Sequence, residues 1–443
     1  MKSISYSALL LAATLCLFAS KSDAQNIPDS NFADAIREVC PACIDSNNNL
    51  TSAAQDLDSL DVLSQGISSL AGIEGFLSLT YLDCSTNELD SLSTLPLGLK
   101  VLRCYNNQLS FLPTLPDSLN ELRCTSNKIT FLPVLPDNLR SLGCSGNEII
   151  SLPTLPNTLT SLACGNNQII SLPVLPNSLT SLLCYHNPLS SLPTLPASLI
   201  YLDCSYNQLD SLPLLPKDLA FLYCSSNQLS TLPILPDSLK SLWCRYNLLN
   251  SLPTLPDNLN TLKCPYNQLN SLPALPNTLR YLDCYDNQLI SLPTLPDSLS
   301  DLVCSQNPFL SCLPLLPNGL TALYTWNTQI TCIPNLPPSL ATIFPLLPLC
   351  AEPCTPSVST SNIHAAKHFS VQPNPVSEVL QVRFSADYET NTDFRLLDAN
   401  GRVVRALSGR GDMEIPVGDL PQGIYWLEVR GAKSVFAEKI LKQ

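Results

Sequence analysis

The feature that most constrains this chain is a cysteine that returns every 20 residues, twelve times in succession and without a slip. Three residues after each cysteine comes an asparagine, from Asn87 to Asn307. Such strict self-similarity predicts a stack of identical coils rather than an ordinary globular domain. The cysteines are Cys84, Cys104, Cys124, Cys144, Cys164, Cys184, Cys204, Cys224, Cys244, Cys264, Cys284 and Cys304.

Each repeat combines a short strand with a proline-rich return. Leu162 and Cys164 alternate with polar or small residues, so a strand here points them inward and Ala163 outward. The amide of Asn167 both donates and accepts, so it can satisfy turn backbone groups of its own coil and of the next. In the return, two prolines three apart remove donors and fix φ, which predicts an extended, polyproline II-like segment. One unit reads Leu159-x-x-Leu162-x-Cys164-x-x-Asn167-x-Ile169, then Leu172-Pro173-x-Leu175-Pro176.

This pattern resembles the leucine-rich repeat, in the short 20-residue form of bacterial effector proteins, and it covers about two thirds of the chain. The resemblance implies a solenoid with a parallel β-sheet on its concave face and extended segments on its convex face. We expect about 14 coils over residues 57–349, with atypical coils at both ends because end coils cover an otherwise open core.

The N-terminus carries features of an exported protein. Residues 1–24 are typical of a signal peptide, with Lys2, an apolar stretch from Ala8 to Ala19, and Ser22-Asp23-Ala24 before the cleavage point. Residues 25–56 are predicted to form an N-terminal cap. No later stretch is long and apolar enough for a transmembrane segment.

The last part of the chain loses the repeat. Residues 350–368 are predicted to be a linker, and residues 369–443 alternate apolar and polar in short runs typical of a small β-sandwich. This stretch resembles the C-terminal sorting domain of the type IX secretion system, which implies that the secretion machinery exports the protein to the cell surface or beyond. A permanent adhesive β-domain is the alternative. The matching motifs are Pro373-Asn374-Pro375-Val376, Leu397-Asp398-x-x-Gly401-Arg402-Val403-Val404, Leu420-Pro421-x-Gly423-Ile424-Tyr425 and Lys439-Ile440-Leu441-Lys442.

The cysteine ladder raises the question of metal binding. In-register stacking places each sulfur beside those of the next coils in one straight row, without the tetrahedral convergence that zinc requires. Buried thiols among leucines behave as small hydrophobic side chains. The sequence therefore predicts core packing, with no metal and no cofactor.

Cysteines outside the ladder are candidates for structural disulfides, which an exported protein can keep. Cys312 and Cys332 each precede an apolar-proline pair, so they occupy equivalent places in successive coils, and we expect them to bond to each other. The second expected pair is Cys350 with Cys354, just past the solenoid. Cys40 and Cys43 form Cys-Pro-Ala-Cys in the cap; a redox role would need a βαβ context that is absent.

Known catalytic motifs are missing from the sequence, and its three histidines have no evident partners. A formal net charge of −13 argues against nucleic acid as a partner. The sequence therefore predicts a binding protein and not an enzyme.

Aromatic residues gather at outward strand positions or on the rim beside them. Ten of the 14 tyrosines fall there: Tyr81, Tyr105, Tyr185, Tyr201, Tyr206, Tyr223, Tyr246, Tyr266, Tyr281 and Tyr285. Phe221, Trp243 and Trp326 join them, with the cations Arg103, Arg123, Arg245 and Lys263.

Tyrosine, tryptophan and arginine are enriched at binding hot spots, although aromatic residues also favour strands in general. We predict recognition or adhesion at the cell surface, with a protein or glycan ligand on the concave face; the alternative is a structural surface-layer component without a specific ligand. The predicted ligand-binding residues are Tyr201, Tyr206, Phe221, Tyr223, Trp243, Arg245, Tyr246, Lys263, Tyr266, Tyr281 and Tyr285.

Overall fold

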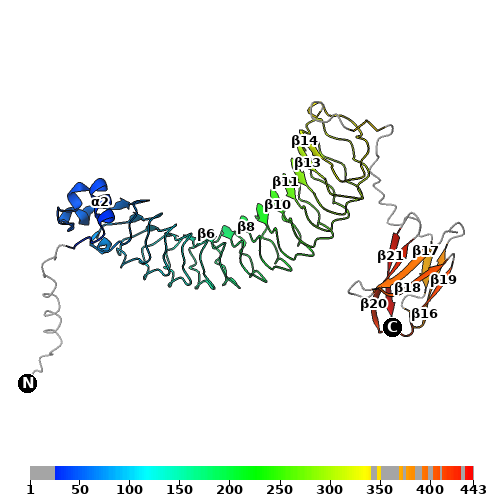
Figure 1. Cartoon of the computed structure of the whole chain (residues 1–443), viewed down its shortest axis with the longest axis horizontal. Helices are drawn as coiled ribbons and strands as arrows, with labels where there is room; N and C mark the ends of the chain where they lie inside the picture. The colour runs from blue at the N-terminus through cyan, green and yellow to red at the C-terminus, as the bar shows by residue number, and fades with distance from the viewer. Residues whose placement is uncertain are drawn as a thin grey trace, which may run out of the picture. The chain divides into compact units, whose positions relative to one another are not determined.

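The computed structural model divides the chain into two compact units, Met1–Pro356 and Ser357–Gln443 (Figure 1). The structure describes residues 25–340, 347–350, 369–372, 376–384, 392–397, 403–409, 412–430 and 435–442. The predicted signal peptide and residues 351–368 of the predicted linker lie outside the described residues.

A small cap precedes the first strand. Asp29 caps its helix by accepting a hydrogen bond of 2.9 Å from the Phe32 backbone N–H. The second oxygen of the same carboxylate accepts from the Ser68 N–H at 2.8 Å, which ties the cap to the first coil. The cap elements are the helix α2 (Ser30–Val39) and the 3₁₀ turns η1 (Pro41–Cys43) and η2 (Ser52–Asp56).

Fourteen parallel strands, in sequence order from β1 to β14, form one continuous sheet. Each strand has three residues, and Figure 1 shows them stacked along one side of the coils. A further 3₁₀ turn, η3 (Ile73–Gly75), lies in the first, variant coil. The strands are β1 (Ser59–Asp61), β2 (Tyr81–Asp83), β3 (Val101–Arg103), β4 (Glu121–Arg123), β5 (Ser141–Gly143), β6 (Ser161–Ala163), β7 (Ser181–Leu183), β8 (Tyr201–Asp203), β9 (Phe221–Tyr223), β10 (Ser241–Trp243), β11 (Thr261–Lys263), β12 (Tyr281–Asp283), β13 (Asp301–Val303) and β14 (Ala322–Tyr324).

The predicted phase of the strands is confirmed. Leu222, Leu242 and Leu262 are register partners on neighbouring strands, and each is completely buried. All twelve ladder cysteines are buried as well and carry free thiols. The Leu-Pro-x-Leu-Pro returns contain neither helix nor strand, as their prolines predict.

The asparagine ladder joins each coil to the one before it. The Asn227 Nδ2 donates to the carbonyl oxygen of Cys224 in its own coil at 3.2 Å and to that of Cys204 in the preceding coil at 3.0 Å. Its Oδ1 accepts from the Leu209 N–H at 3.0 Å. One side chain therefore satisfies backbone groups that no strand pairing reaches, which is why the repeat requires an amide here.

We expect Asn227→Ala to lower the free energy of unfolding by about 2 kcal/mol, because the N–H of the buried Leu209 loses its acceptor. Denaturant unfolding followed by circular dichroism measures the change. Asn250→Ala is the matched control, since that exposed side chain accepts only from the Ser251 hydroxyl among the described residues. Equal decreases in the free energy of unfolding of the two variants would contradict the role of Asn227 in joining neighbouring coils.

The structure corrects the predicted disulfides at the end of the solenoid. Cys332 bonds to Cys350, with 5.0 Å between their Cα atoms, and not to Cys312. The physical reason is a return of the chain: Leu349 pairs in parallel with Ile333, and the Cys350 N–H donates to the Ile333 carbonyl at 2.8 Å.

The predicted pairing of Cys350 with Cys354 is wrong for the same reason. Cys312 is also disulfide-bonded, and Cys354 lies outside the described residues. In the cap, Cys40 bonds to Cys43 as expected.

The second unit is a small β-sandwich, as predicted. A three-stranded antiparallel sheet, β15-β16-β19, and a four-stranded one, β18-β17-β20-β21, enclose a core that includes Leu380, Phe394 and Leu427. The Tyr425 hydroxyl donates to the Pro421 carbonyl at 2.9 Å. The strands are β15 (Phe369–Gln372), β16 (Val379–Phe384), β17 (Thr392–Leu397), β18 (Val403–Gly409), β19 (Met413–Pro416), β20 (Gly423–Arg430) and β21 (Val435–Lys442).

Candidate functional site

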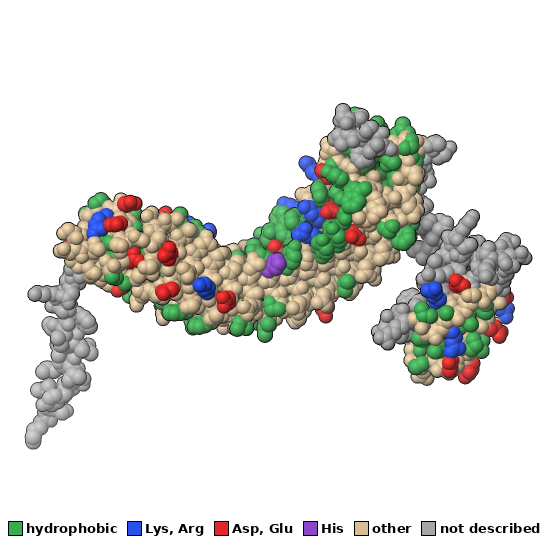
Figure 2. All heavy atoms as spheres, in the orientation of Figure 1, with side chains coloured by type: hydrophobic (Ala, Val, Ile, Leu, Met, Phe, Trp, Pro, Cys, Tyr) green, Lys and Arg blue, Asp and Glu red, His purple; other side chains and the backbone are tan. Residues whose placement is uncertain are grey.

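The outward residues of strands β8 to β12 form one aromatic surface. Figure 2 shows a region of hydrophobic side chains with Lys and Arg side chains among them on the strand-bearing side of the coils. Parallel pairing at a fixed register places residues 20 apart beside each other. Two rows of side chains result, one on the strands and one along the rim that follows them.

The first row, here called the strand row, consists of Tyr201, Phe221, Tyr223, Trp243, Lys263 and Tyr281. The Tyr223 and Trp243 rings lie 4.6 Å apart, and the Tyr201 ring meets that of Tyr223 edge-on at 5.3 Å. The Lys263 Nζ lies 4.2 Å from the centre of the Trp243 ring and 4.9 Å from that of Tyr281. These contacts make the row continuous across five coils.

The second row, here called the rim row, consists of His186, Tyr206, Tyr246, Tyr266, Tyr285 and Trp326. Tyr246 and Tyr266 are stacked with ring centres 4.0 Å apart and planes 7° apart. Tyr285 meets Tyr266 edge-on at 5.1 Å, and Trp326 lies 5.4 Å from Tyr285. Hydrogen bonding between the Tyr266 hydroxyl and the hydroxyls of Tyr246 and Tyr285 raises the pKa of Tyr266.

His186 belongs to this rim row, although no partner for it was evident from the sequence. Its ring stacks on Tyr206 with centres 4.0 Å apart and planes 9° apart. The two residues lie one repeat apart at equivalent positions. That spacing is the signal by which the sequence could have placed them together.

Several rim residues have an unusual backbone. His186, Tyr206, Tyr246 and Tyr266 have φ between 51° and 56°, in the left-handed region that bulky residues seldom adopt. The same position in other coils holds small or polar residues such as Asn106, Ser126, Gly146, Asn166 and Asp286. The tight turn after the strand imposes this conformation on every coil, so four of them carry an aromatic side chain where a smaller residue would be less strained.

Arg245 binds a member of the rim row. Its Nη2 donates to the Tyr206 hydroxyl, two coils away, at 3.2 Å. The Trp243 Nε1 and the Arg245 Nε are buried, and neither has a hydrogen-bond partner among the described residues. Buried donors without acceptors are uncommon in folded proteins and cost free energy. These two N–H groups, at the centre of the surface, are therefore an exception that calls for an explanation.

Two carboxylates flank this centre: Asp283 is paired in register with Lys263, and Asp203 is paired in register with Tyr223. Burial of Asp283 raises the pKa of its carboxyl, against opposing effects of a hydrogen bond from the Tyr285 N–H and of the charges on Lys263 and Arg245. Burial, followed by the neighbouring Tyr223 and Asp203, raises the pKa of Tyr201 to about 12. Solvent access at this surface is therefore low enough to shift the pKa values of its own side chains.

The upstream members of the predicted aromatic face form a separate cluster. Arg103 lies 5.4 Å from the centre of the Tyr81 ring and 3.1 Å from Glu121. Arg123 also pairs with Glu121, at 2.8 Å. Glu121 thus pairs with both of these cations, whereas among the described residues Arg245 and Lys263 form no ion pair.

Burial raises the pKa of the ladder thiols, to about 12 for Cys124 and Cys164 among others. Among the described residues, no group of three or more histidine, cysteine or acidic side chains is arranged to hold a metal ion. In the cap, the Asp45 carboxylate accepts hydrogen bonds from the backbone N–H groups of Asn47 and Asn49.

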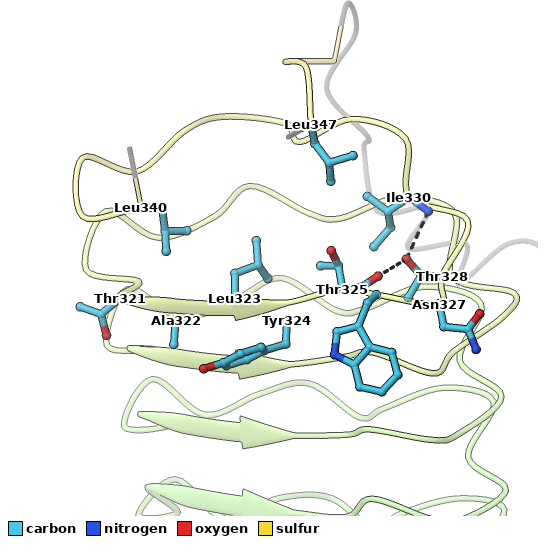
Figure 3. A pocket seen from close by; sticks show the side chains of 11 residues that line it. Thr321, Ala322, Leu323, Tyr324, Thr325, Asn327, Thr328, Ile330, Leu340 and Leu347 are labelled. Atoms are coloured by element: carbon cyan, nitrogen blue, oxygen red, sulfur yellow. Dashed lines mark hydrogen bonds between the residues drawn. The ribbon is translucent and has the colours of Figure 1, made fainter. Parts of the chain in front are cut away.

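A pocket of about 490 Å³ lies at the last coil, where Leu323, Ile330 and Leu340 line it (Figure 3). Thr328 takes the asparagine position there. Its hydroxyl donates to the Thr325 carbonyl at 2.7 Å and accepts from the Ile330 N–H at 3.3 Å. Residues 341–346, next in sequence to a lining residue, lie outside the described residues, so we assign the pocket no ligand.

Two solved structures of the effector YopM resemble this chain. YopM from Yersinia enterocolitica is 37% identical, with a TM-score of 0.54, over 62% of this chain and 64% of that one. YopM from Yersinia pestis, described as a leucine-rich effector protein, is 32% identical, with a TM-score of 0.59, over 72% of this chain and 98% of that one.

The functional domain of the internalin InlJ from Listeria monocytogenes, described as including a cysteine ladder, shares the fold. It is 21% identical with a TM-score of 0.60, over 94% of this chain and 97% of that one. No curated protein matches the sequence.

The protein therefore belongs to the bacterial leucine-rich repeat proteins. More particularly, it is a secreted member of that class, because residues 370–443 match the family described as the secretion system C-terminal sorting domain. Among the described residues, no helix is long and apolar enough to cross a membrane.

Proposed function

We propose that this protein is a non-catalytic recognition or adhesion module that binds a protein or glycan ligand through the strand row and the rim row. The observation that carries the proposal is the backbone of the rim. His186, Tyr206, Tyr246 and Tyr266 occupy a left-handed position where other coils have small or polar residues. Strained residues that persist without a gain in folding are characteristic of functional surfaces.

The centre of the surface has the composition of a binding hot spot. Trp243, Arg245 and Tyr223 come from two adjacent coils. Trp243 and Tyr223 are in contact within the strand row, and Arg245 donates to Tyr206 of the rim row. Large rigid rings supply contact area at a low cost in conformational entropy. The alternative function, a structural surface component without a specific ligand, gives no reason for aromatic side chains at left-handed positions.

The route to the cell surface is part of the proposal. Residues 1–24 would direct export across the inner membrane, and residues 369–443 would engage the type IX secretion machinery. Residues 25–56 would cap the solenoid of residues 57–349, and residues 350–368 would link it to the sorting domain. The binding surface would then face the outside of the cell or the medium.

We expect Trp243→Ala to weaken ligand binding by about 2 kcal/mol, roughly 30-fold, because it removes the ring between Tyr223 and Lys263. Glycan arrays and displayed peptide libraries screened with the purified protein provide the ligands, and titration calorimetry measures the affinity. Ile234→Ala is the control, since that side chain is 86% exposed in a Leu-Pro return. If the Trp243 variant binds every recovered ligand as well as the parent, the structural-component function is favoured.

A further inference from the structure

The orientation of the rings limits which ligands the surface can accept. Tyr246 and Tyr266 stack face to face, as do His186 and Tyr206. Trp243 has Tyr223 beside it and the Lys263 ammonium over its ring. Neighbouring coils therefore cover one face of each stacked ring, and what the rows offer a ligand includes many ring edges and hydroxyl groups.

Ring edges favour a different chemistry from ring faces. Sugars stack on exposed aromatic faces, whereas the edge of an aromatic ring carries partial positive charge and attracts oxygen acceptors. A surface of edges and hydroxyls is thus better suited to the carbonyl and carboxylate groups of a polypeptide than to the rings of a polysaccharide.

The charges at the centre of the surface also favour a polypeptide ligand. In the part of the chain that the structure describes, neither Arg245 nor Lys263 forms an ion pair. Asp283 is the register partner of Lys263, and its burial favours the protonated form, whereas Asp203 is the register partner of Tyr223. Among the described residues neither carboxylate forms an ion pair with Arg245 or Lys263, whereas Glu121 pairs with both cations of the upstream cluster.

Two N–H donors complete the arrangement. The Trp243 Nε1 and the Arg245 Nε have no partner among the described residues, and they lie on the same outward face of one coil. A carboxylate can accept from several donors at once and is the natural partner of an arginine.

We propose that the ligand of this surface is a protein segment that carries a carboxylate, which docks between Arg245, Lys263 and Trp243 while its backbone carbonyls meet the tyrosine edges. This proposal rests on the proposed function and narrows the ligand to an acidic polypeptide.

The probe is a displayed library of random 12-residue peptides, screened in parallel with a glycan array on the full-length purified protein. We expect recovered peptides to be enriched in Asp and Glu. Changing the acidic residue of a peptide to its amide should weaken binding by about tenfold or more, as should Arg245→Gln or Lys263→Gln in the protein. Raising the salt concentration should weaken the parent complex more than either variant complex.

Arg140→Gln is the control, because it makes the same charge change at an exposed position five coils upstream of Arg245. Thermal unfolding of all three variants checks that the fold is intact. One outcome would overturn the acidic-polypeptide proposal and leave the proposed function intact. In that outcome the parent binds glycans, Trp243→Ala does not, and Arg245→Gln and Lys263→Gln bind them as well as the parent. Absence of any binder in both screens would overturn both.

Discussion

Raising the pH above about 9 is expected to unfold this protein cooperatively, because it carries twelve buried free thiols. An exposed thiol ionises near pH 8.5, whereas burial raises the pKa of Cys124, Cys164, Cys224 and Cys304 to about 12. A group whose pKa is raised on folding contributes stability that is complete below its unfolded pKa. That stability is lost as the pH rises toward the folded value, here between about 9 and 12.

The expected effect is large because the thiols act together. Each loses about 1.4 kcal/mol per pH unit in this window, so twelve lose on the order of 15 kcal/mol per unit. That equals the whole free energy of unfolding of many domains. Circular dichroism during an alkaline titration should show the solenoid lost near pH 10, and alkylating reagents should label the thiols slowly before the transition and quickly after it.

The control for alkaline unfolding varies the number of thiols. Each of Cys124→Ala, Cys164→Ala and Cys224→Ala should reduce the pH dependence of the unfolding free energy by about 1.4 kcal/mol per unit. The tyrosines and lysines are the same in all of these proteins, so their ionisation cancels in the comparison. An unchanged slope would show that the thiols are not protected in the folded state.

The second large effect is expected at one strand, where neighbouring residues have opposite roles. Leu242 is completely buried between Leu222 and Leu262, so Leu242→Ala should lower the free energy of unfolding by about 2–5 kcal/mol through lost burial and a cavity. Trp243 points outward and packs against Tyr223 and Lys263, so Trp243→Ala should change it by about 1 kcal/mol or less.

Denaturant unfolding measures the difference in stability between the two variants. For ligand binding we expect the reverse: Trp243→Ala should weaken affinity more than Leu242→Ala. Leu262→Ala repeats the inward substitution on the next strand and should match Leu242→Ala. Comparable destabilisation by the Trp243 and Leu242 variants would contradict the alternation of inward and outward residues.

The repeat explains why so much of the solenoid could be predicted. Among the described residues, the Asn227 side chain hydrogen-bonds to backbone groups of its own coil and the preceding one, and its backbone N–H donates to the Tyr246 carbonyl in the next coil. A period of 20 residues therefore specifies the complete arrangement. The same period predicts that Leu242 points inward and Trp243 outward, because a strand alternates its two faces. The repeat also made it possible to predict which residues lie on the rim.

The end of the solenoid shows where periodicity no longer predicts the structure. Equivalent positions in successive coils suggested a bond between Cys312 and Cys332, but Cys332 meets Cys350 because Leu349 returns beside Ile333. The repeat pattern degenerates after Thr325, so nothing in its period specifies that return. The Cys40–Cys43 pair was predictable because three residues of chain hold its members together.

By itself, therefore, the sequence determined the coil, the inward and outward phase of each strand, and the class of protein. Only the tertiary structure decided how the outward side chains meet: the stacking of His186 on Tyr206, the reach of Arg245 to a tyrosine two coils away, and the donors at Trp243 and Arg245 that lack acceptors. The physical reason is that a repeat fixes the backbone of every coil alike, whereas the side-chain contacts depend on which different residues the neighbouring coils present.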